Sequence, residues 1–518
     1  MNTKALRQKV LDLAIHGKLV PQNPNDESAE VLLKKIREEK AEKIKKGELK
    51  ADKKDSFIFT KECEFDEDKL GKCSSGTRHK RHYEQFADGT VKDIEDEIPF
   101  EVPEGWAWCR LTNVAITELG KTLDAKKNKG ESYDYLCALN VKWYTFDFTT
   151  LKQIRLEEKE KERYLVRKGD LLICEGGDVG RSAIWESDNP IYYQNALHRV
   201  RFYQNINQYF FLHVLNYYKN IGLIDDVSGG VTIKHFTQNS MQKLLFPLPP
   251  LAEQERIVSV IKNIFSQIDT LDQNKSDLQT AINKTKSKIL DLAIHGKLVP
   301  QDPNDEPAEE LLKRIATSDN RPYKKFEEDE VPFIIPFNWK WERLAKISSI
   351  ISKGTTPRGG KNAYCIEGIN YLRVENISAD GTINLEDINH ISENEHLTFL
   401  KRSILQENDV IISIAGTLGK IGIIRKCDLP MNTNQAIAFV RISNLSIINL
   451  KYLRYVLESV ELQRLLLSQT KVTSIPNLTL EIINNCPIPL PPIQEQNRIV
   501  SKIEELFSDL DSISSNLE

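Results

Sequence analysis

One stretch of this chain occurs twice, almost unchanged. Residues 9–36 read KVLDLAIHGKLVPQNPNDESAEVLLKKI and residues 288–315 read KILDLAIHGKLVPQDPNDEPAEELLKRI, so only five of the 28 aligned positions differ. A second stretch recurs as PLPPLAEQERIVSVIKNIFS at 247–266 and PLPPIQEQNRIVSKIEELFS at 489–508. The first pair is offset by 279 residues (288 minus 9) and the second by 242 (489 minus 247). Only the centre of the chain holds both stretches in a row, so the chain is a circularly permuted duplication built from two related halves.

Between the repeated stretches lie two bodies that share a frame but differ in most residues. IPFEVPEGWAWCRL at 98–111 matches VPFIIPFNWKWERL at 331–344, and KGDLLICEGGDVGR at 168–181 matches ENDVIISIAGTLGK at 407–420. Short β-like runs before glycine-containing turns recur in both bodies, and each body ends in a more helical stretch. We expect one mixed α/β scaffold that carries two different surfaces.

The repeated ends of the bodies carry a helical stripe. In the centre, apolar residues are spaced alternately by four and three positions, which is typical of a coiled coil, at Ile257, Ile261, Ile264, Ile268, Leu271, Leu278, Ile282, Ile289 and Leu292. This stripe would extend about 54 Å at ~1.5 Å per residue. Both terminal stretches continue the stripe, and their connectivity predicts antiparallel pairing with the central helix. A helix that merely dimerises two chains is the alternative.

These observations predict an α+β protein. Two mixed α/β domains would be separated by a long antiparallel helical coiled-coil spacer with pseudo-two-fold symmetry. The expected parts are an N-terminal helical region (1–36), a charged linker with an extended or flexible insert (37–97), a first domain (98–246), a central helical spacer (247–315), a linker (316–330), a second domain (331–488) and a C-terminal helix (489–518).

Charge is distributed unevenly along the chain. The formal net charge is −4, yet residues 98–245 hold 19 Lys and Arg against 18 Asp and Glu, and residues 331–486 hold 17 against 14. Two near-neutral or mildly basic bodies therefore sit in acidic connecting material. For a DNA-binding protein, such weak basicity indicates that other subunits supply part of the contact with phosphates.

Composition excludes several classes of protein. No apolar run approaches the ~20 residues that a membrane span needs, and the amphipathic start favours a cytoplasmic protein over a secreted one. The eight cysteines are scattered, as expected of free thiols in a reducing compartment. A zinc site is conceivable at Cys63, Cys73, His79 and His82, but a solvated loop is favoured because no CxxC pair is present. We expect no metal site.

Near-matches to catalytic motifs are incomplete. AITELGKT at 115–122 ends like a phosphate-binding loop but carries Ile, Glu and Leu where flexible glycine is needed. NPIY at 189–192 resembles the loop with which amino-methyltransferases hold a flipped adenine, but the second proline is missing and no methyl-donor motif precedes it. The carboxylates of 157–162 alternate with lysines like a solvated helix face. No catalytic or cofactor-binding residue is expected in the chain.

Loops that follow strands offer side chains able to read base edges. The candidate DNA-binding residues are, in the first body, Lys121, Thr122, Lys142, Arg181, Gln194, Asn195 and Lys234, and, in the second, Thr355, Thr356, Arg358, Lys361, Lys420, Asn434, Gln435 and Lys471. The alternative for each of them is ordinary solvated surface.

The repeated LDLAIHGKLVPQ stretch, the PLPPLAEQERIV and PLPPIQEQNRIV helix starts and the tryptophan-containing openings of both bodies resemble the specificity subunits of type I restriction-modification systems over nearly the whole chain. The resemblance implies that each body recognises one half of an asymmetric, bipartite site in double-stranded DNA. It also implies that the repeated helices set the gap and dock two methyltransferase subunits. S-adenosylmethionine, ATP and Mg²⁺ would then be bound by partner subunits, which methylate adenine or translocate and cut DNA.

Two rival functions belong to other classes. A DNA methyltransferase or combined restriction enzyme would need a methyl-donor motif, which the sequence lacks. A scaffold that presents two modules to ligands other than DNA would give no salt-sensitive DNA binding. The sequence gives neither the bases recognised nor the length of the gap.

Overall fold

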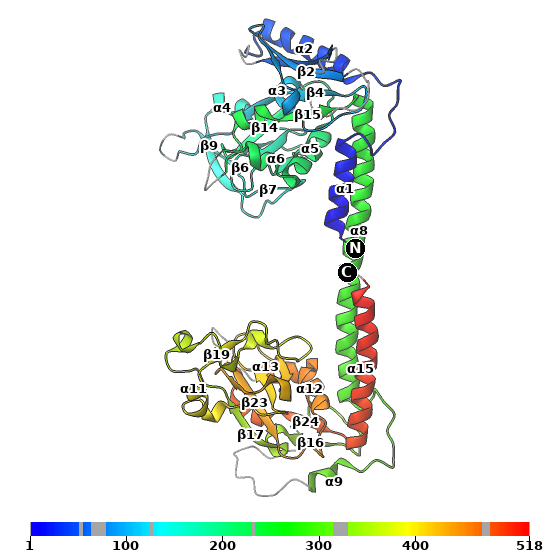
Figure 1. Cartoon of the computed structure of the whole chain (residues 1–518), viewed down its shortest axis with the longest axis vertical. Helices are drawn as coiled ribbons and strands as arrows, with labels where there is room; N and C mark the ends of the chain where they lie inside the picture. Colours follow the sequence, from blue (N-terminus) through cyan, green and yellow to red (C-terminus); the bar gives the residue numbers. More distant parts are fainter. Residues whose placement is uncertain are drawn as a thin grey trace, which may run out of the picture. The chain divides into compact units, whose positions relative to one another are not determined.

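The computed structural model describes residues 2–50, 55–63, 79–124, 126, 128–229, 234–313, 330–468 and 477–516. The chain divides into two compact units, residues 1–273 and 274–518. Each unit combines helices with small β-sheets, so the predicted α+β class is confirmed (Figure 1). One helix, α8 (Leu251–Ile294, 44 residues), begins in unit 1 and ends in unit 2. No helix in the described ranges is both long enough and apolar enough to span a membrane.

In unit 1, α1 (Thr3–Ile15) packs against the first part of α8. Asn2 caps α1 by accepting a hydrogen bond from the Ala5 N–H at 3.0 Å. Arg7, near the start of α1, pairs with Asp269 of α8 at 2.6 Å, whereas Gln22, beyond the end of α1, donates to Glu253 at 2.9 Å. Residue numbers rise along α1 as they fall along α8, so the two helices are antiparallel as predicted.

In unit 2, α15 (Ile493–Ser515) packs in the same way against the last part of α8. Ser514 donates to Gln279 at 2.8 Å, and Gln301 donates to Glu495 at 2.5 Å. The second contact repeats Gln22 with Glu253 at the matching positions of the duplication. Antiparallel pairing is therefore confirmed in this unit too.

The apolar stripe of α8 is buried only in part. Ile257, Ile261 and Ile268 are at most 1% exposed. By contrast, Leu271 is 42% and Leu278 39% exposed, so the predicted seam is not covered continuously within either unit. The buried ends belong to the cores of the units: Ile257 and Ile261 join the unit 1 core with residues of α1, and the ends of α8 and α15 share the unit 2 core.

The described residues of unit 1 form four sheets and a two-stranded hairpin. Their orders are β1-β2-β3, β15-β4, β12-β11-β14-β5, β10-β13-β6-β9 and β7-β8. The strands are β1 (Ser56–Cys63), β2 (His79–Phe86), β3 (Val91–Asp93), β4 (Ala107–Arg110), β5 (Ala115–Leu119), β6 (Glu131–Leu136), β7 (Val141–Lys142), β8 (Thr145–Phe146), β9 (Lys152–Leu156), β10 (Leu165–Val166), β11 (Leu171–Cys174), β12 (Ser182–Ile184), β13 (Ile191–Tyr193), β14 (Leu197–Phe202) and β15 (Leu245–Leu248). The other helices are α2 (Ala29–Lys45), α3 (Leu111–Val114), α4 (Glu158–Tyr164), α5 (Gln208–Asn220), α6 (Leu223–Val227) and α7 (Gln238–Lys243).

In its described part, unit 2 repeats the larger sheets of this arrangement but has no strands equivalent to β1–β3, β7, β8 or β10. Its sheets are β16-β24, β17-β23-β20-β21 and β19-β18-β22, and β22 runs parallel to β18 as β13 does to β6. The strands are β16 (Lys340–Arg343), β17 (Ser348–Lys353), β18 (Ile369–Leu372), β19 (Asn389–Ile391), β20 (Val410–Ser413), β21 (Ile421–Ile423), β22 (Met431–Thr433), β23 (Ile437–Ile442) and β24 (Pro487–Leu490). The helices are α9 (Ala308–Lys313), α10 (Leu344–Ile347), α11 (Glu393–Leu397), α12 (Leu450–Glu458), α13 (Val460–Ser468) and α14 (Leu480–Asn484). The common scaffold inferred from the duplicated frame is thus present.

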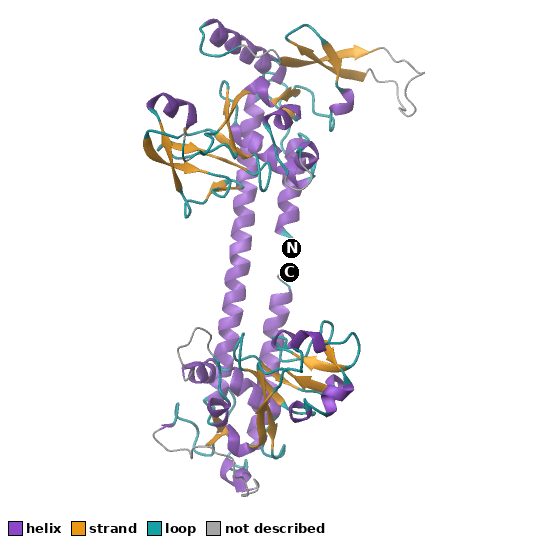
Figure 2. Cartoon of the chain, turned by 90° about the vertical axis from the view of Figure 1, so that its left-hand side faces the viewer, coloured by secondary structure: helices purple, strands orange, loops and turns teal. Residues whose placement is uncertain are grey.

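The described parts of the segment 37–97, predicted as a linker with an extended or flexible insert, contain a helix end and three strands. Helix α2 continues to Lys45, and the antiparallel strands β1, β2 and β3 form a separate sheet at one end of unit 1 (Figure 2). In β1, Phe57 and Phe59 lie on one face of the strand and Ile58 on the other, since successive side chains of a strand point to opposite faces. Cys63, Cys73 and His79, weighed above as zinc ligands, have side chains outside the described part, while the His82 ring lies 3.0 Å from Glu95.

Candidate DNA interface

In unit 1, three predicted residues meet where β5 and β13 end. Lys121 and Gln194 form a parallel β-bridge, and the Asn195 N–H donates to the Lys121 carbonyl at 3.0 Å. Gly120 makes this approach possible, because a Cβ there would lie 2.2 Å from the Gln194 carbonyl oxygen. The two loops are therefore joined by main-chain contacts that do not depend on their side chains.

Unit 2 builds the same junction from different residues. The Thr355 N–H donates to the Thr433 carbonyl at 3.0 Å, and the Asn434 N–H donates to the Leu372 carbonyl at 3.1 Å. A Cβ on Gly354 would lie 2.0 Å from the Asn434 carbonyl oxygen, as at Gly120. The frame thus presents Lys121 beside Gln194 in one unit and Thr355 beside Asn434 in the other.

Three of the predicted cations are engaged within the protein. Lys121 pairs with Glu160 and lies over the Tyr164 ring. Arg181 donates to the Ala138 carbonyl at 2.6 Å, and its counterpart Lys420 donates to the Ile377 carbonyl at 2.9 Å. Arg181 thus joins the turn after β11 to the loop after β6, and Lys420 joins the turn after β20 to the loop after β18. Both side chains therefore hold loops in position within the protein.

The other predicted residues that can be described remain accessible. Thr122, Gln435 and Arg358 are exposed, and the Arg358 guanidinium lies 4.5 Å from the centre of the Phe399 ring. Lys142 and Lys234 are each 46% exposed and lie 4.0 and 3.8 Å from single carboxylates. Thr356 is half-buried. The side chain of Lys361 and the whole of Lys471 lie outside the described residues.

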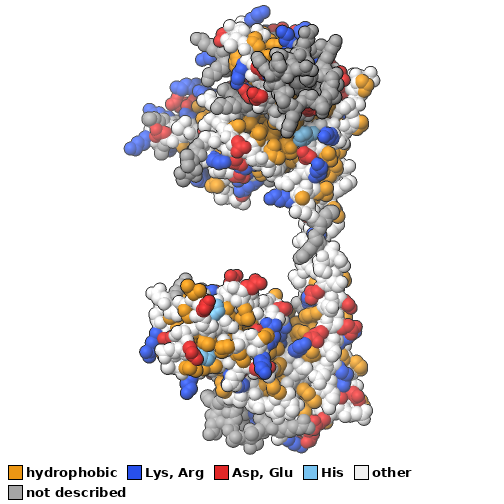
Figure 3. Space-filling model, viewed as in Figure 1, with side chains coloured by type: hydrophobic (Ala, Val, Ile, Leu, Met, Phe, Trp, Pro, Cys, Tyr) orange, Lys and Arg blue, Asp and Glu red, His pale blue; other side chains and the backbone are white. Residues whose placement is uncertain are grey.

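Charges of both signs are interspersed on the visible face of each unit (Figure 3). Buried histidines add no positive charge in unit 1. Burial lowers the pKa of His198 to about 4 and that of His213 to about 3, so both rings are neutral near pH 7. The accessible lysines and arginines must supply the attraction for phosphate.

Asp291, His295 and Glu461 place possible ligand atoms within 4.8 Å of one another in unit 2. The His295 Nδ1 atom lies 2.7 Å from the Asp291 carbonyl oxygen. His16 makes the same contact with Asp12 at 2.8 Å in unit 1. The histidine contact therefore belongs to the repeated helix end and gives no separate indication of a metal.

Comparison with known proteins identifies the family to which this duplicated frame belongs. The sequence profile of the type I restriction modification DNA specificity domain matches residues 103–280 and again 336–517, which together make up more than half of the chain. The chain belongs to this family. The two matches begin at equivalent prolines of the duplicated frame, Pro103 and Pro336.

Relatives of this specificity-domain chain are similar over most of its length. It is 29% identical to the type I restriction enzyme EcoAI specificity subunit of Escherichia coli, over 97% of this chain and 89% of that protein. It is 30% identical to the EcoBI specificity subunit of the same species, over 69% and 70%. A solved structure described as "Structural basis underlying complex assembly and conformational transition of the type I R-M system" shares the fold, with a TM-score of 0.59, 18% identity, and 81% and 94% coverage.

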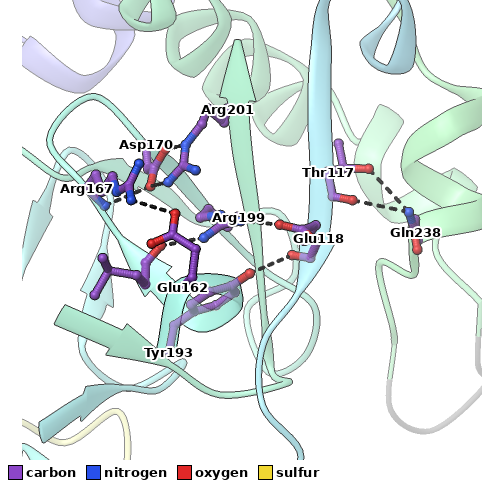
Figure 4. Close-up of polar contacts among 10 residues, drawn as sticks. Thr117, Glu118, Glu162, Arg167, Asp170, Tyr193, Arg199, Arg201 and Gln238 are labelled. Carbon is purple, nitrogen blue, oxygen red and sulfur yellow. Dashed lines mark hydrogen bonds and ion pairs between the residues drawn. The ribbon is translucent and has the colours of Figure 1, made fainter. Parts of the chain in front are cut away.

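A polar network in the first specificity domain was not predicted from the sequence. Arg199 of β14 pairs with Glu118 of β5, and the Tyr193 hydroxyl donates to the Glu118 carbonyl at 3.2 Å (Figure 4). Arg201 donates two hydrogen bonds to the Asp170 carboxylate, at 2.7 and 2.6 Å, and these hydrogen bonds raise the pKa of Arg201. These residues lie beside the junction of Lys121 with Gln194.

Half of this network is shared between the two domains. Arg441 donates two hydrogen bonds to the Asp409 carboxylate, at 2.8 and 2.7 Å, in the same way as Arg201 donates to Asp170. This pair therefore belongs to the frame that the two domains share. In contrast, Phe439 of β23 stands where β14 has Arg199. The sequence already contained a signal for this difference, because Arg199 is aligned with Phe439 in the QNALHRVR and NQAIAFVR stretches. Only the structure shows that Arg199 pairs with Glu118.

Proposed function

We propose that this chain is the DNA-specificity subunit of a type I restriction-modification complex and that it contacts an asymmetric, bipartite site in double-stranded DNA through its two domains. The observation that carries the proposal is the double match to the DNA specificity domain, one match for each unit. Support comes from the two equivalent loop junctions, which hold different side chains, Lys121 with Gln194 and Thr355 with Asn434, on one main-chain frame. Different side chains on one frame suit two different half-sites.

The remaining parts of the complex follow from this role. We propose that the repeated helices dock two methyltransferase subunits and that restriction and translocation subunits join them, in the cytoplasm. The chain itself would be non-catalytic, and S-adenosylmethionine, ATP and Mg²⁺ would bind in the partner subunits. Such partners would also supply phosphate contacts that a chain with a net charge of −4 needs.

Methylation sequencing tests whether each of the two domains recognises one half of the DNA site. The chain is co-expressed with the methyltransferase subunits of its system, and methylated adenine should appear in one bipartite motif. Replacing residues 98–246 by the matching domain of another family member should change one half of the motif and leave the other half and the gap unchanged. A change in both halves, or methylation without a bipartite motif, would contradict the proposal.

A single lysine tests the interface at residue level. Lys142→Ala should weaken DNA binding and lower the slope of log affinity against log salt by about one, if the amino group meets a phosphate. Lys9→Ala is the matched control, because Lys9 is also an accessible lysine beside one carboxylate, Asp12 at 2.7 Å, but lies on α1. Equal effects of the two variants would remove Lys142 from the interface.

A further inference from the structure

The β1–β3 sheet of unit 1 creates a groove that the duplication does not explain. A cavity of about 520 Å³ lies between α2 and β1. Helix α2 lines it with Glu30, Leu33, Arg37 and Lys40, β1 lines it with residues 56–60, and β2 adds Lys80, Gln85 and Phe86. Lys40 closes one end by pairing with Asp55 at 2.6 Å.

The strand that borders this groove has an open edge. The Ser56 carbonyl accepts a hydrogen bond from the Asn113 side chain at 2.6 Å, so this carbonyl points away from β2. Backbone directions alternate along antiparallel strands, and the N–H and C=O groups of Ile58 and Thr60 therefore also point away from β2. No hydrogen bond from the described residues reaches these outward groups. An extended segment could add to β1 there as a further strand.

The side chains around the edge define the chemistry of such a segment. Phe57 and Phe59 offer partly buried rings, and the Arg37 guanidinium lies 4.5 Å from the centre of the Phe57 ring. Arg37 and Lys80 are exposed and pair with no carboxylate of the described residues. A segment with a carboxylate opposite Arg37 or Lys80 and an apolar residue opposite the rings fits the groove. A nucleic acid would lack the backbone groups that match the strand edge.

The position of the groove connects it to the repeated helical element. Leu33 lies within the repeat 9–36, whose second copy is 288–315. In the described part of unit 2, no strand takes the place of β1, β2 or β3. A partner that binds both copies of the repeat would thus find the additional strand edge only in unit 1.

We propose that a methyltransferase subunit docked on the first repeat inserts an extended, acidic segment along β1, and that the second methyltransferase subunit has no equivalent contact. This inference rests on the proposed function. It makes the two docking sites unequal, with the tighter site on unit 1, although the repeated helices are nearly identical in sequence.

Strand addition is tested with Thr60→Pro in the full chain, co-expressed with its methyltransferase subunits. Because the Thr60 N–H points away from β2, proline removes the donor without removing a bond of the β1–β2 ladder. Thr60→Ala keeps the N–H and is the control. Hydrogen–deuterium exchange should show the outward amide of Ile58 protected in the wild-type and Thr60→Ala complexes but not in the Thr60→Pro complex.

The charge requirement is tested with Arg37→Glu. Lys34→Glu is the control, since Lys34 is an exposed cation on the same helix outside the groove. The methyltransferase concentration is lowered stepwise, and native mass spectrometry counts the subunits bound to each variant. The Arg37→Glu complex should lose one of its two methyltransferase subunits at a methyltransferase concentration about tenfold higher than the Lys34→Glu complex does.

The outcomes separate this inference from the proposed function. Failure of methyltransferase subunits to bind the wild-type chain at all would contradict both. Binding of two subunits without protection of the outward Ile58 amide would overturn only the inference. Protection that appears solely on adding DNA, or in a dimer of the chain alone, would assign the groove to another occupant and overturn it as well.

Discussion

Gly17 and Gly296 should be the most sensitive small residues of the repeated element. Both follow a repeated helix and have positive φ, +63° and +64°. A Cβ on Gly17 would lie 2.3 Å from Pro103 Cγ, and one on Gly296 would lie 2.4 Å from Pro336 Cγ. Alanine at either position would therefore combine an unfavourable backbone conformation with a steric clash against a proline ring.

The magnitude can be separated into two parts. A non-glycine residue in the left-handed region costs about 1–2 kcal/mol, and overpacking a well-filled site costs about 1–3 kcal/mol. Gly17→Ala and Gly296→Ala should thus each lower the free energy of unfolding by about 2–5 kcal/mol. Gly47 is the control: its φ is +75°, but a Cβ on Gly47 would have no neighbour within 4 Å, so Gly47→Ala should cost only about 1–2 kcal/mol.

Urea unfolding followed by tryptophan fluorescence measures the difference. A Cβ on Gly17 would lie 3.2 Å from the Trp106 ring, and one on Gly296 would lie 3.1 Å from that of Trp339, so the signal reports on the perturbed sites. If Gly17→Ala or Gly296→Ala destabilised the chain no more than Gly47→Ala, the steric part of the reasoning would be refuted.

Four further predictions concern charge and burial. Burial lowers the pKa of His213 to about 3, so this residue alone should make stability fall by about 1.4 kcal/mol per pH unit as the pH drops below 6.5, and His213→Gln should reduce the slope of acid unfolding by that amount while the contribution of His198 remains. Burial raises the pKa of Glu495, so the free energy of unfolding should fall as the pH rises from 4.5 through the raised pKa and the carboxyl group ionises. In Glu495→Gln, urea midpoints measured over this pH range should fall less than in the wild type, and an equal fall would contradict the prediction. Arg441→Met should cost about 3–5 kcal/mol in thermal unfolding, because it leaves the fully buried Asp409 carboxylate without its guanidinium partner. Arg358→Ala should weaken DNA binding and lower the salt slope by about one in fluorescence anisotropy, without changing methyltransferase binding.

The sequence predicted those parts of the fold that repetition makes visible. The offset of the two repeats gave the antiparallel helices, and Gln22 with Glu253 and Gln301 with Glu495 make the matching contacts. The β1–β3 sheet was missed because it has no second copy to align and because charged residues around it resemble a solvated linker. The apolar run of Phe57, Ile58 and Phe59 was the available signal, but it is short.

The sequence predicted which loops lie together better than it predicted what the side chains on those loops contact. Lys121 and Gln194 were chosen separately, and the structure joins them in one β-bridge. Arg181 and Lys420 were chosen as base readers, yet both donate to carbonyls of a neighbouring loop. A basic residue beside glycine looks the same in sequence whether it faces solvent or the carbonyl of another loop, so which contacts reach DNA stays a prediction.

The division between main-chain and side-chain contacts explains how one frame can recognise two half-sites. The loop junctions are held by backbone hydrogen bonds and by glycines at 120 and 354, neither of which constrains the neighbouring side chains. The pairs Asp170–Arg201 and Asp409–Arg441 fix the sheets in both units. Residues such as Arg199 and Phe439 can then differ, because each needs only a partner within its own domain. A change in the sequence that either domain recognises would therefore require new side chains on its loops and no change in the main-chain frame.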